Sequence, residues 1–170
     1  LEFLFQRLRL PVRDAAAREG KEVRVVTSGE DVNIDKTIAD ALFGPMLHLV
    51  RNAVVHGIEA PNARQATGKK ETGTLTLAAR QESGQIVLEV RDDGNGLDLA
   101  ALHAKGVQMG VIPPETSVND QVVKDLVFAA GLSTKATVGN VAGRGVGGNV
   151  VRRAVDRING SIRVDTMPGK

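Results

Sequence analysis

The stretch HLVRNAVVH, residues 48–56, carries a polar side chain at every fourth position. His48, Asn52 and His56 therefore form one row along a predicted helix, because residues four apart share a helical face. The apolar residues between them supply a buried stripe on the other faces. Such a row alone is typical of a solvated helix surface. A zinc site is discounted, since no glutamate follows His48 as it does in zinc-binding metalloprotease helices.

A second motif, DDGNG at residues 92–96, follows a predicted strand. A carboxylate fixed at a strand end, with glycines that let a ligand approach the backbone, suits a flat ring that bears an amino donor. Adenine has such a donor. A simple tight Asp-Gly turn is the alternative interpretation.

The third motif is GRGVGGN, residues 143–149, at the start of a predicted helix. Backbone N–H groups exposed by glycines at a helix N-terminus form a natural phosphate site. The motif also matches the GxGxxG pattern of dinucleotide-binding folds, with Asp165 near the position of the ribose-binding acid. That pattern should follow an apolar strand directly, whereas residues 133–142 are polar and contain Gly139.

The order of the remaining elements indicates the fold class. We predict an α+β fold, a two-layer sandwich in which helices cover one face of a mixed, mostly antiparallel sheet. A hairpin is predicted at 74–81 and 85–91, and 57–73 is predicted to be a loop. The other expected elements are a helix at 1–19 interrupted by Pro11 and ended by Gly20, a strand at 23–27, a helix from 35–37 to about 56, helices at 99–109, 119–129 and 150–158, and a strand from 162.

Composition excludes several function classes. At 170 residues the chain suits one domain. A formal charge of only +2, with four Phe and neither Trp nor Tyr, disfavours a nucleic-acid partner. The absence of cysteine excludes thiol chemistry. The apolar runs are too short or too interrupted to predict a membrane span, so we expect no membrane insertion and a cytoplasmic location.

Taken in order, the three motifs and the turn GLST at 131–134 resemble the N, G1, F and G2 boxes of the GHKL ATPases, which share the Bergerat fold. That superfamily covers DNA gyrase, MutL-type repair proteins, gyrase-type heat-shock chaperones and histidine kinases. The wording HLVRNA with HGIE, FAAGLSTK at 128–135 and GRGVG at 143–147 is closest to chemotaxis histidine kinases of the CheA type.

This resemblance implies a site for ATP and Mg²⁺. Asp92 would accept the adenine amino group, and Gly94 and Gly96 would make room for the ring. Asn52 would ligate Mg²⁺, and His48 would orient or deprotonate an incoming histidine. Further members of the nucleotide pocket would be Arg51, His56, Lys105, Ser133, Thr134, Gly143, Gly145 and Gly147.

The resemblance also implies partners and boundaries. The γ-phosphoryl group would pass to a histidine on a separate phosphotransfer domain of the same kinase. A CheW-like coupling protein, chemoreceptors and, indirectly, a response regulator would engage the full-length homodimer. Residues 1–20 would be a lead-in helix from the dimerisation region, and 21–170 the catalytic domain, with a mobile ATP lid between Leu97 and Gly143 and its closing strand missing after Lys170. His103, in the lid helix, is expected to be solvated.

Two departures from the family pattern keep an alternative function open. Val55 stands where the family usually has Asp, and Gly148-Asn149 replaces the usual Met-Asp. Because carboxylates near a magnesium triphosphate assist metal handling, their loss is compatible with a nucleotide-binding regulatory module with weak or no transfer activity.

Overall fold

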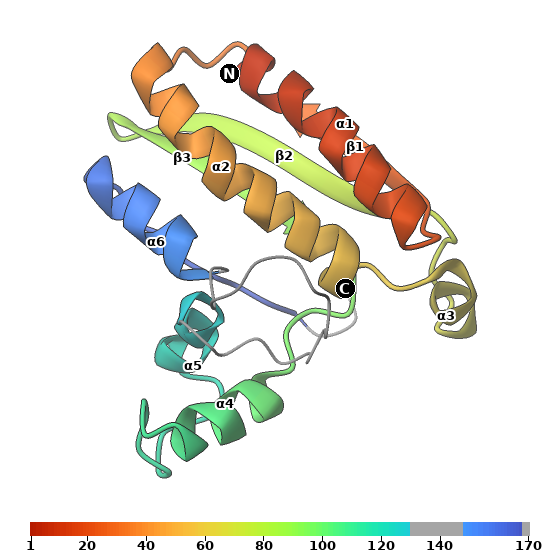
Figure 1. Cartoon of the computed structure of the whole chain (residues 1–170), viewed down its shortest axis with the longest axis vertical. Coiled ribbons are helices and arrows are strands. Elements are labelled where there is room, and N and C mark those ends of the chain that lie inside the picture. The colour runs from red at the N-terminus through yellow and green to blue at the C-terminus, as the bar shows by residue number, and fades with distance from the viewer. Residues whose placement is uncertain (130–147, 168–170) are drawn as a thin grey trace. The chain divides into compact units, whose positions relative to one another are not determined.

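The computed structural model describes residues 1–129 and 148–167, and it separates into two compact units. The first unit runs from Leu1 to Gly96, and the second begins at Leu97. Figure 1 shows their elements. Each unit is described by itself.

The first unit is built on a three-stranded sheet. Its strands are β1 (Val23–Ser28), β2 (Gly73–Glu82) and β3 (Gln85–Asp92), in the order β1-β2-β3. β1 pairs parallel with β2, and β2 pairs antiparallel with β3. Ser83 and Gly84, between β2 and β3, both have positive φ, of 49° and 79°, as a type I′ hairpin turn requires. The predicted strands and hairpin are confirmed.

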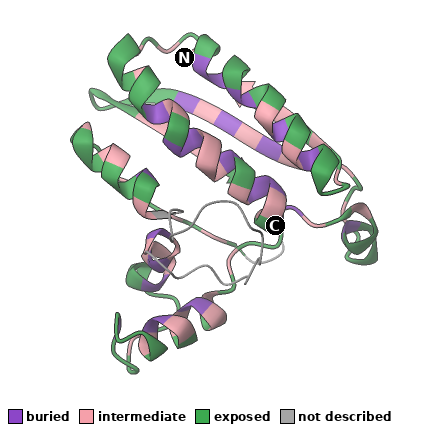
Figure 2. Ribbon diagram, in the orientation of Figure 1, coloured by how far each residue is buried: buried purple, intermediate pink, exposed green. Residues whose placement is uncertain are grey.

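Two long helices cover one face of this sheet (Figure 1). α1 (Glu2–Arg18) and α2 (Lys36–Asn52) pack side by side, α1 also against β1 and α2 also against β3. Along β2 every second residue from Gly73 to Ala79 is buried, as expected of a strand with one covered face. Figure 2 shows the matching buried stripes on the strand and on both helices. The core residues of α1 recur three and four apart: Leu4, Phe5, Leu8, Val12 and Ala16.

α1 runs without a break through Pro11, so the predicted interruption was wrong. Proline has helical φ and forfeits one backbone hydrogen bond, and the buried side chains of Leu8 and Val12 on either side hold the helix in place. Gly20 ends the helix as predicted, with φ +62°. The Lys21 amide donates to the carbonyl of Ala16 at 2.9 Å, as in a Schellman cap. α1 thus contributes to the core of the first unit.

α2 begins directly after its predicted N-cap, Asp35, and continues at its C-terminal end into a π-helical turn. The Asp35 side chain accepts a hydrogen bond from the Thr37 amide at 2.7 Å, which satisfies one free donor of the first turn. The α-helix passes at Ala53 into a π-helical turn, η1 (Ala53–Gly57). Its signature is the bond from the Ile58 amide to the Ala53 carbonyl, at 2.7 Å.

Among the described residues, the segment Lys36–Gly57 is long and apolar enough to cross a membrane by length and composition alone. Core helices of soluble proteins pass the same test, and this segment packs on the sheet through buried residues such as Leu42, Met46 and Val50. The finding is therefore weak evidence for a membrane span.

The predicted loop at 57–73 contains a short helix, α3 (Pro61–Ala66). Pro61 occupies the first helical position, where its fixed φ suits the helix and its missing N–H costs nothing. The glycines and proline indicated a loop, and the segment nevertheless contains about one and a half helical turns.

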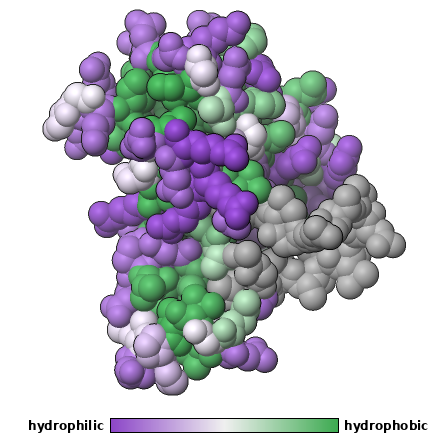
Figure 3. All heavy atoms as spheres, turned by 60° about the vertical axis from the view of Figure 1, so that its left-hand side comes forward, coloured by the Kyte–Doolittle hydropathy of each residue, from purple (hydrophilic) through white to green (hydrophobic). Residues whose placement is uncertain are grey.

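The second unit consists of helices around a small core. They are α4 (Leu99–Gln108), α5 (Gln121–Asp125), the 3₁₀ turn η2 (Leu126–Phe128) and α6 (Gly148–Arg157). The core is formed by Leu102, Ile112, Val123 and Leu126. Figure 3 shows hydrophobic side chains gathered on the outside of this unit as well, where the exposed residues include Met109, Val111, Val118 and Val122.

Two expectations for the second unit were wrong. Residues 162–164 form no strand, and the Val164 carbonyl accepts a hydrogen bond from the Gln121 side chain at 3.0 Å. His103 is half-buried, not solvated, and its Nε2 bonds the Thr116 carbonyl at 2.8 Å.

Candidate functional site

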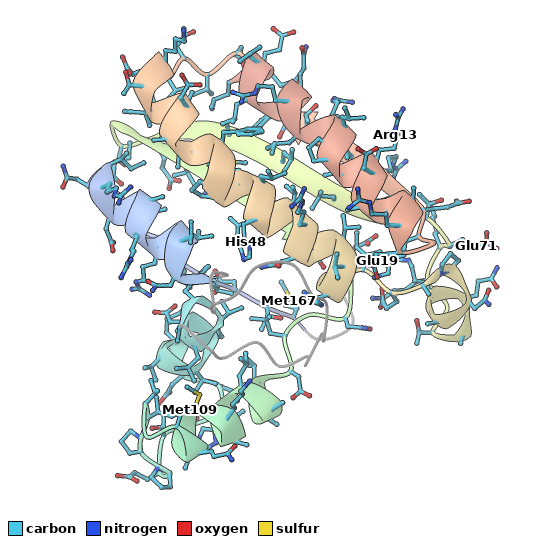
Figure 4. The ribbon with its side chains drawn as sticks, in the orientation of Figure 1. Arg13, Glu19, His48, Glu71, Met109 and Met167 are labelled. Atoms are coloured by element: carbon cyan, nitrogen blue, oxygen red, sulfur yellow. The ribbon has the colours of Figure 1, made fainter. Side chains whose placement is uncertain are left out.

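The polar row on α2 is present, and its first two members are in contact. Nδ2 of Asn52 lies 2.9 Å from Nε2 of His48, one helical turn away. Figure 4 shows His48 on the side of α2 that faces away from α1. Burial, and then the nearby charges of Arg51 and His56, hold the pKa of His48 below its ordinary value of 6.5. His48 is therefore neutral at pH 7.

The contact fixes the roles of both side chains. An amide nitrogen can only donate, so Nε2 of His48 accepts and Nδ1 of the neutral ring carries the proton. The same orientation turns the Asn52 carbonyl oxygen away from His48. The pair thus offers a ligand one hard oxygen acceptor from Asn52 and one N–H donor from His48.

The last residue of the polar row, His56, lies in the π-helical turn η1, and a lysine from outside the helix binds the backbone of this turn. Because the Ile58 amide bonds Ala53 instead of Val54, the carbonyls of Val54 and Val55 lack their usual helical donors. Lys21 Nζ donates to both, at 2.8 and 2.9 Å. Val55, the residue that replaces an expected Asp, is half-buried at this position.

The DDGNG turn after β3 touches the end of η1 through two glycines. The Asn95 amide donates to the Gly57 carbonyl at 3.0 Å. A Cβ on Gly94 would overlap the Gly57 carbonyl, and a Cβ on Gly57 would lie 2.7 Å from Oδ1 of Asp92. Position 94 therefore requires glycine for this close approach, whereas a side chain at position 57 would have to displace the Asp92 carboxylate. Gly96 has φ +73°, a conformation that also favours glycine. Gly57 belongs to the motif HGIE, but the motif did not predict this role for it.

Asp92 stands beside this glycine contact with a half-buried carboxylate. Its Oδ1 accepts a hydrogen bond from the Gly94 amide at 3.0 Å. Burial raises the pKa of Asp92 above its ordinary value of 3.8, and the nearby carboxylates of Asp93 and Glu59 add to the rise. An ionised carboxylate in such surroundings is a strong acceptor for an amino group.

Four charged residues form an ion-pair network that contacts the turn, and none of them was predicted from the sequence as a site residue. The ion-pair network consists of Glu59, Arg64, Lys69 and Asp93. The Arg64 side chain is only 2% exposed and pairs with Glu59 at 2.8 Å and with the Asp93 carboxylate at 3.1 Å. Lys69 Nζ pairs with the other oxygen of Glu59 at 2.8 Å. Burial opposes ionisation of Glu59, but the hydrogen bonds from Lys69 and Arg64 outweigh it, so its pKa is lowered.

The network also binds the backbone of the turn. Lys69 Nζ donates to the carbonyls of Asp93 and Gly94, at 3.0 and 2.9 Å. Arg64 Nη1 donates to the Asp93 carbonyl at 3.2 Å, and Asp93 Oδ1 accepts from the Thr74 amide at 2.9 Å. These contacts connect the turn to the segment that contains α3 and to the first residues of β2.

The structure places the other predicted site residues separately. Arg51 is exposed and borders a shallow pocket of about 150 Å³ between α1 and α2, next to Asp14 and Arg18. His56 is exposed on η1. Lys105 is half-buried on α4, in the second unit. The predicted phosphate and lid residues lie outside the described part of the chain: Ser133, Thr134, Gly143, Gly145 and Gly147.

A metal site formed by protein side chains alone is not found in the described ranges 1–129 and 148–167. No three His, Asp or Glu side chains there come together in a way that could hold an ion. A cation at this site would therefore need oxygens from a ligand in addition to a single protein group such as Asn52.

Comparison with known proteins reveals extensive similarity. The sequence model of the histidine kinase-, DNA gyrase B- and HSP90-like ATPases matches residues 37–170. The chain is 40% identical over 167 residues to the chemotaxis protein CheA of Rhizobium meliloti (strain 1021), covering 98% of the chain and 22% of that protein. It is 44% identical over 161 residues to the CheA of Treponema pallidum (strain Nichols), covering 95% and 20%. The sensor histidine kinase CheAY of Helicobacter pylori (strain ATCC 700392 / 26695) is 36% identical, with 98% and 21% covered. The chain spans about a fifth of the length of these curated relatives.

Proposed function

The chain belongs to the histidine kinase-, DNA gyrase B- and HSP90-like ATPase family, and we propose that it is the ATP-binding catalytic domain of a chemotaxis histidine kinase. The observation that carries the proposal is the contact between Gly57 and the Asp92 turn. It joins a half-buried carboxylate to the end of the helix that bears His48 and Asn52.

Asp92 is proposed to bind the adenine base. Its carboxylate can accept the exocyclic amino group. The Cβ space of Gly94 is taken up by the Gly57 carbonyl, so this glycine serves the contact that holds Asp92 in place, and Gly96 is proposed to leave room for a flat ring. A carboxylate discriminates in favour of an amino donor, because a base that presents a carbonyl there would leave two acceptors facing each other.

Asn52 is proposed to hold Mg²⁺. The contact of its amide nitrogen with His48 leaves the hard carbonyl oxygen for a cation, and one protein oxygen supplemented by phosphates and water is a common Mg²⁺ environment. The bound ion would neutralise charge on the phosphates. His48 keeps the Asn52 amide in this orientation.

The proposed reaction transfers the γ-phosphoryl group to a histidine of a separate phosphotransfer domain. An imidazole nitrogen of that histidine forms a bond to the γ-phosphorus, the bond from this phosphorus to the β–γ bridging oxygen breaks, ADP leaves, and the accepting ring loses its N–H proton to solvent water. Catalysis of such a transfer depends on positioning and charge neutralisation. His48 can orient the incoming ring through its Nδ1–H, and this role suits its contact with Asn52 better than deprotonation does.

The wider role is proposed from the named relatives. These relatives are chemotaxis proteins CheA and a sensor histidine kinase, which supports signalling in chemotaxis and disfavours the regulatory module with weak or no transfer activity. We propose that the full-length kinase is a cytoplasmic dimer that acts with a CheW-like coupling protein, chemoreceptors and a response regulator. The other residues that the family resemblance implies stay proposed members of the nucleotide pocket: Arg51, His56, Lys105, Ser133, Thr134, Gly143, Gly145 and Gly147.

Titration calorimetry of the 170-residue chain with a non-hydrolysable ATP analogue tests the proposal. Binding that strengthens with Mg²⁺, and that Asp92→Asn reduces at least tenfold, is the expected result, since a hydrogen bond to a charged acceptor contributes about 1.5–3 kcal/mol. Transfer of γ-³²P to a histidine-containing phosphotransfer domain then tests the reaction. Equal affinity of the wild type and Asp92→Asn would contradict the assigned adenine site.

A further inference from the structure

We propose that the ion-pair network of Glu59, Arg64, Lys69 and Asp93 sets the position of the Asp92 carboxylate and thereby the affinity for nucleotide. Arg64 and Lys69 would then be positioning residues, which act on the ligand through the DDGNG turn. The inference rests on the proposed function, because it assumes that Asp92 binds the nucleotide base.

The burial of these charges is the first argument. The side chains of Arg64, Glu59 and Lys69 are only 2%, 6% and 17% exposed. Removing such groups from water is costly, and a buried ion pair commonly stabilises a fold no better than apolar residues of similar size. Its advantage is geometric, because charged groups with fixed hydrogen-bond directions hold their partners in one arrangement.

The direction of the donors is the second argument. Lys69 Nζ and Arg64 Nη1 both reach the Asp93 carbonyl, and Lys69 also reaches that of Gly94. These carbonyls belong to the residues that follow Asp92 directly, and the Gly94 amide is the donor that holds Oδ1 of Asp92. A shift of this backbone would therefore move the carboxylate through the bond that orients it.

The guanidinium of Arg64 connects the turn to α3 and its flanks. Its Nε donates to the Lys70 carbonyl at 2.7 Å, while its two terminal nitrogens bind Glu59 and Asp93. A lysine at position 64 would keep the charge but could not reproduce this planar set of donors. Arg64→Lys therefore separates the requirement for geometry from the requirement for charge.

The test compares Arg64→Lys and Lys69→Gln with the control Arg80→Gln. Arg80 lies on β2, is 55% exposed, and pairs with the exposed carboxylates of Glu82 and Glu89, so its loss removes surface ion pairs only. Calorimetry with the non-hydrolysable ATP analogue should give a Kd about tenfold higher for both network variants, the lower end of the effect of removing groups that orient a ligating residue. The control should bind as the wild type does.

Hydrogen exchange without nucleotide supplies a readout that a general loss of stability would not produce. The amides of Gly94 and Asn95, which are bonded within the site, should exchange faster in both network variants, while the amide of Leu77 in β2 keeps its rate. Lys69 is partly exposed, so Lys69→Gln keeps the test valid if Arg64→Lys fails to fold.

Wild-type affinity in both folded variants, or faster exchange spread evenly over β2 and the turn, would overturn the inference. If the wild type binds no nucleotide, the proposed function fails and exchange alone decides: a selective increase at Gly94 and Asn95 supports positioning of the turn, and unchanged rates refute it. If the wild type binds and the variants bind equally well, the proposed function stands and this inference falls.

Discussion

Replacing Gly57 by alanine would place a methyl group against the Asp92 carboxylate. The added Cβ would lie 2.7 Å from Oδ1, 2.9 Å from Cγ and 3.0 Å from Oδ2, whereas ordinary contacts begin at 3.4 Å. The overlap with Oδ1 is thus about 0.7 Å. Since φ of Gly57 is not positive, the backbone accepts alanine, and the strain must be relieved by the carboxylate or by a shift of η1.

Two opposing contributions determine the stability of this variant. Overpacking of this kind costs about 1–3 kcal/mol, and exchanging glycine for alanine within a helix returns up to about 1 kcal/mol. The chain should therefore stay folded, with a net loss of at most about 3 kcal/mol. Binding should suffer more: rotation of the carboxylate breaks its bond to the Gly94 amide and removes the adenine acceptor. A hydrogen bond to a charged group contributes about 1.5–3 kcal/mol, so Kd should rise about 10- to 100-fold.

Gly44→Ala is the matched control for Gly57→Ala. Gly44 lies on α2, and an added Cβ there meets nothing within 4 Å. This variant should gain about 0.5–1 kcal/mol from helix propensity and bind the ATP analogue as the wild type does. Urea unfolding measures the stabilities, and titration calorimetry measures Kd. Wild-type affinity in Gly57→Ala would refute the assignment of Asp92 as the base acceptor or the closeness of its contact with Gly57.

Further predictions concern the core and the pH dependence. Phe5→Ala should lower the free energy of unfolding by about 3–5 kcal/mol because Phe5 is fully buried in α1, whereas Phe3→Ala on the exposed side should change it by less than about 0.5 kcal/mol; urea unfolding compares the two. The folded-state pKa of His48 is lowered, so its contribution to stability is complete above pH 6.5 and is lost as the pH falls from 6.5 through the folded value. The free energy of unfolding, measured against pH, should therefore fall in this window for the wild type and not for His48→Gln. Identical pH profiles of the two proteins would contradict a contact in which neutral His48 accepts a hydrogen bond from Asn52. The folded-state pKa of Asp92 is raised, so ionising it costs the folded chain stability as the pH rises from 3.8 through the folded value. Affinity for the ATP analogue should weaken on acidification, because Asp92 then becomes protonated. The residual affinity of Asp92→Asn should not depend on pH in this way.

Local sequence signals predicted much of the first unit. Alternating burial, the Ser83-Gly84 turn and the Asp35 cap are set by residues close to one another in the chain, so β2, β3 and the start of α2 fall where they were expected. The predictions failed where tertiary contacts override a local preference. α1 continues through Pro11 because its neighbours are buried, and the Val164 carbonyl accepts a hydrogen bond from a side chain of α5.

The sequence by itself determined the row of His48 and Asn52, because four-residue spacing on a helix places two side chains on one face wherever that helix packs. It also determined that a carboxylate ends β3 and that glycines follow it. Only the tertiary structure decided that Gly57 contacts Asp92 and that Arg64 and Lys69 donate hydrogen bonds to the backbone of the same turn. The position of a single glycine or a single charged residue in the sequence does not indicate which distant residue it will contact. These contacts form only when the sheet and its covering helices pack.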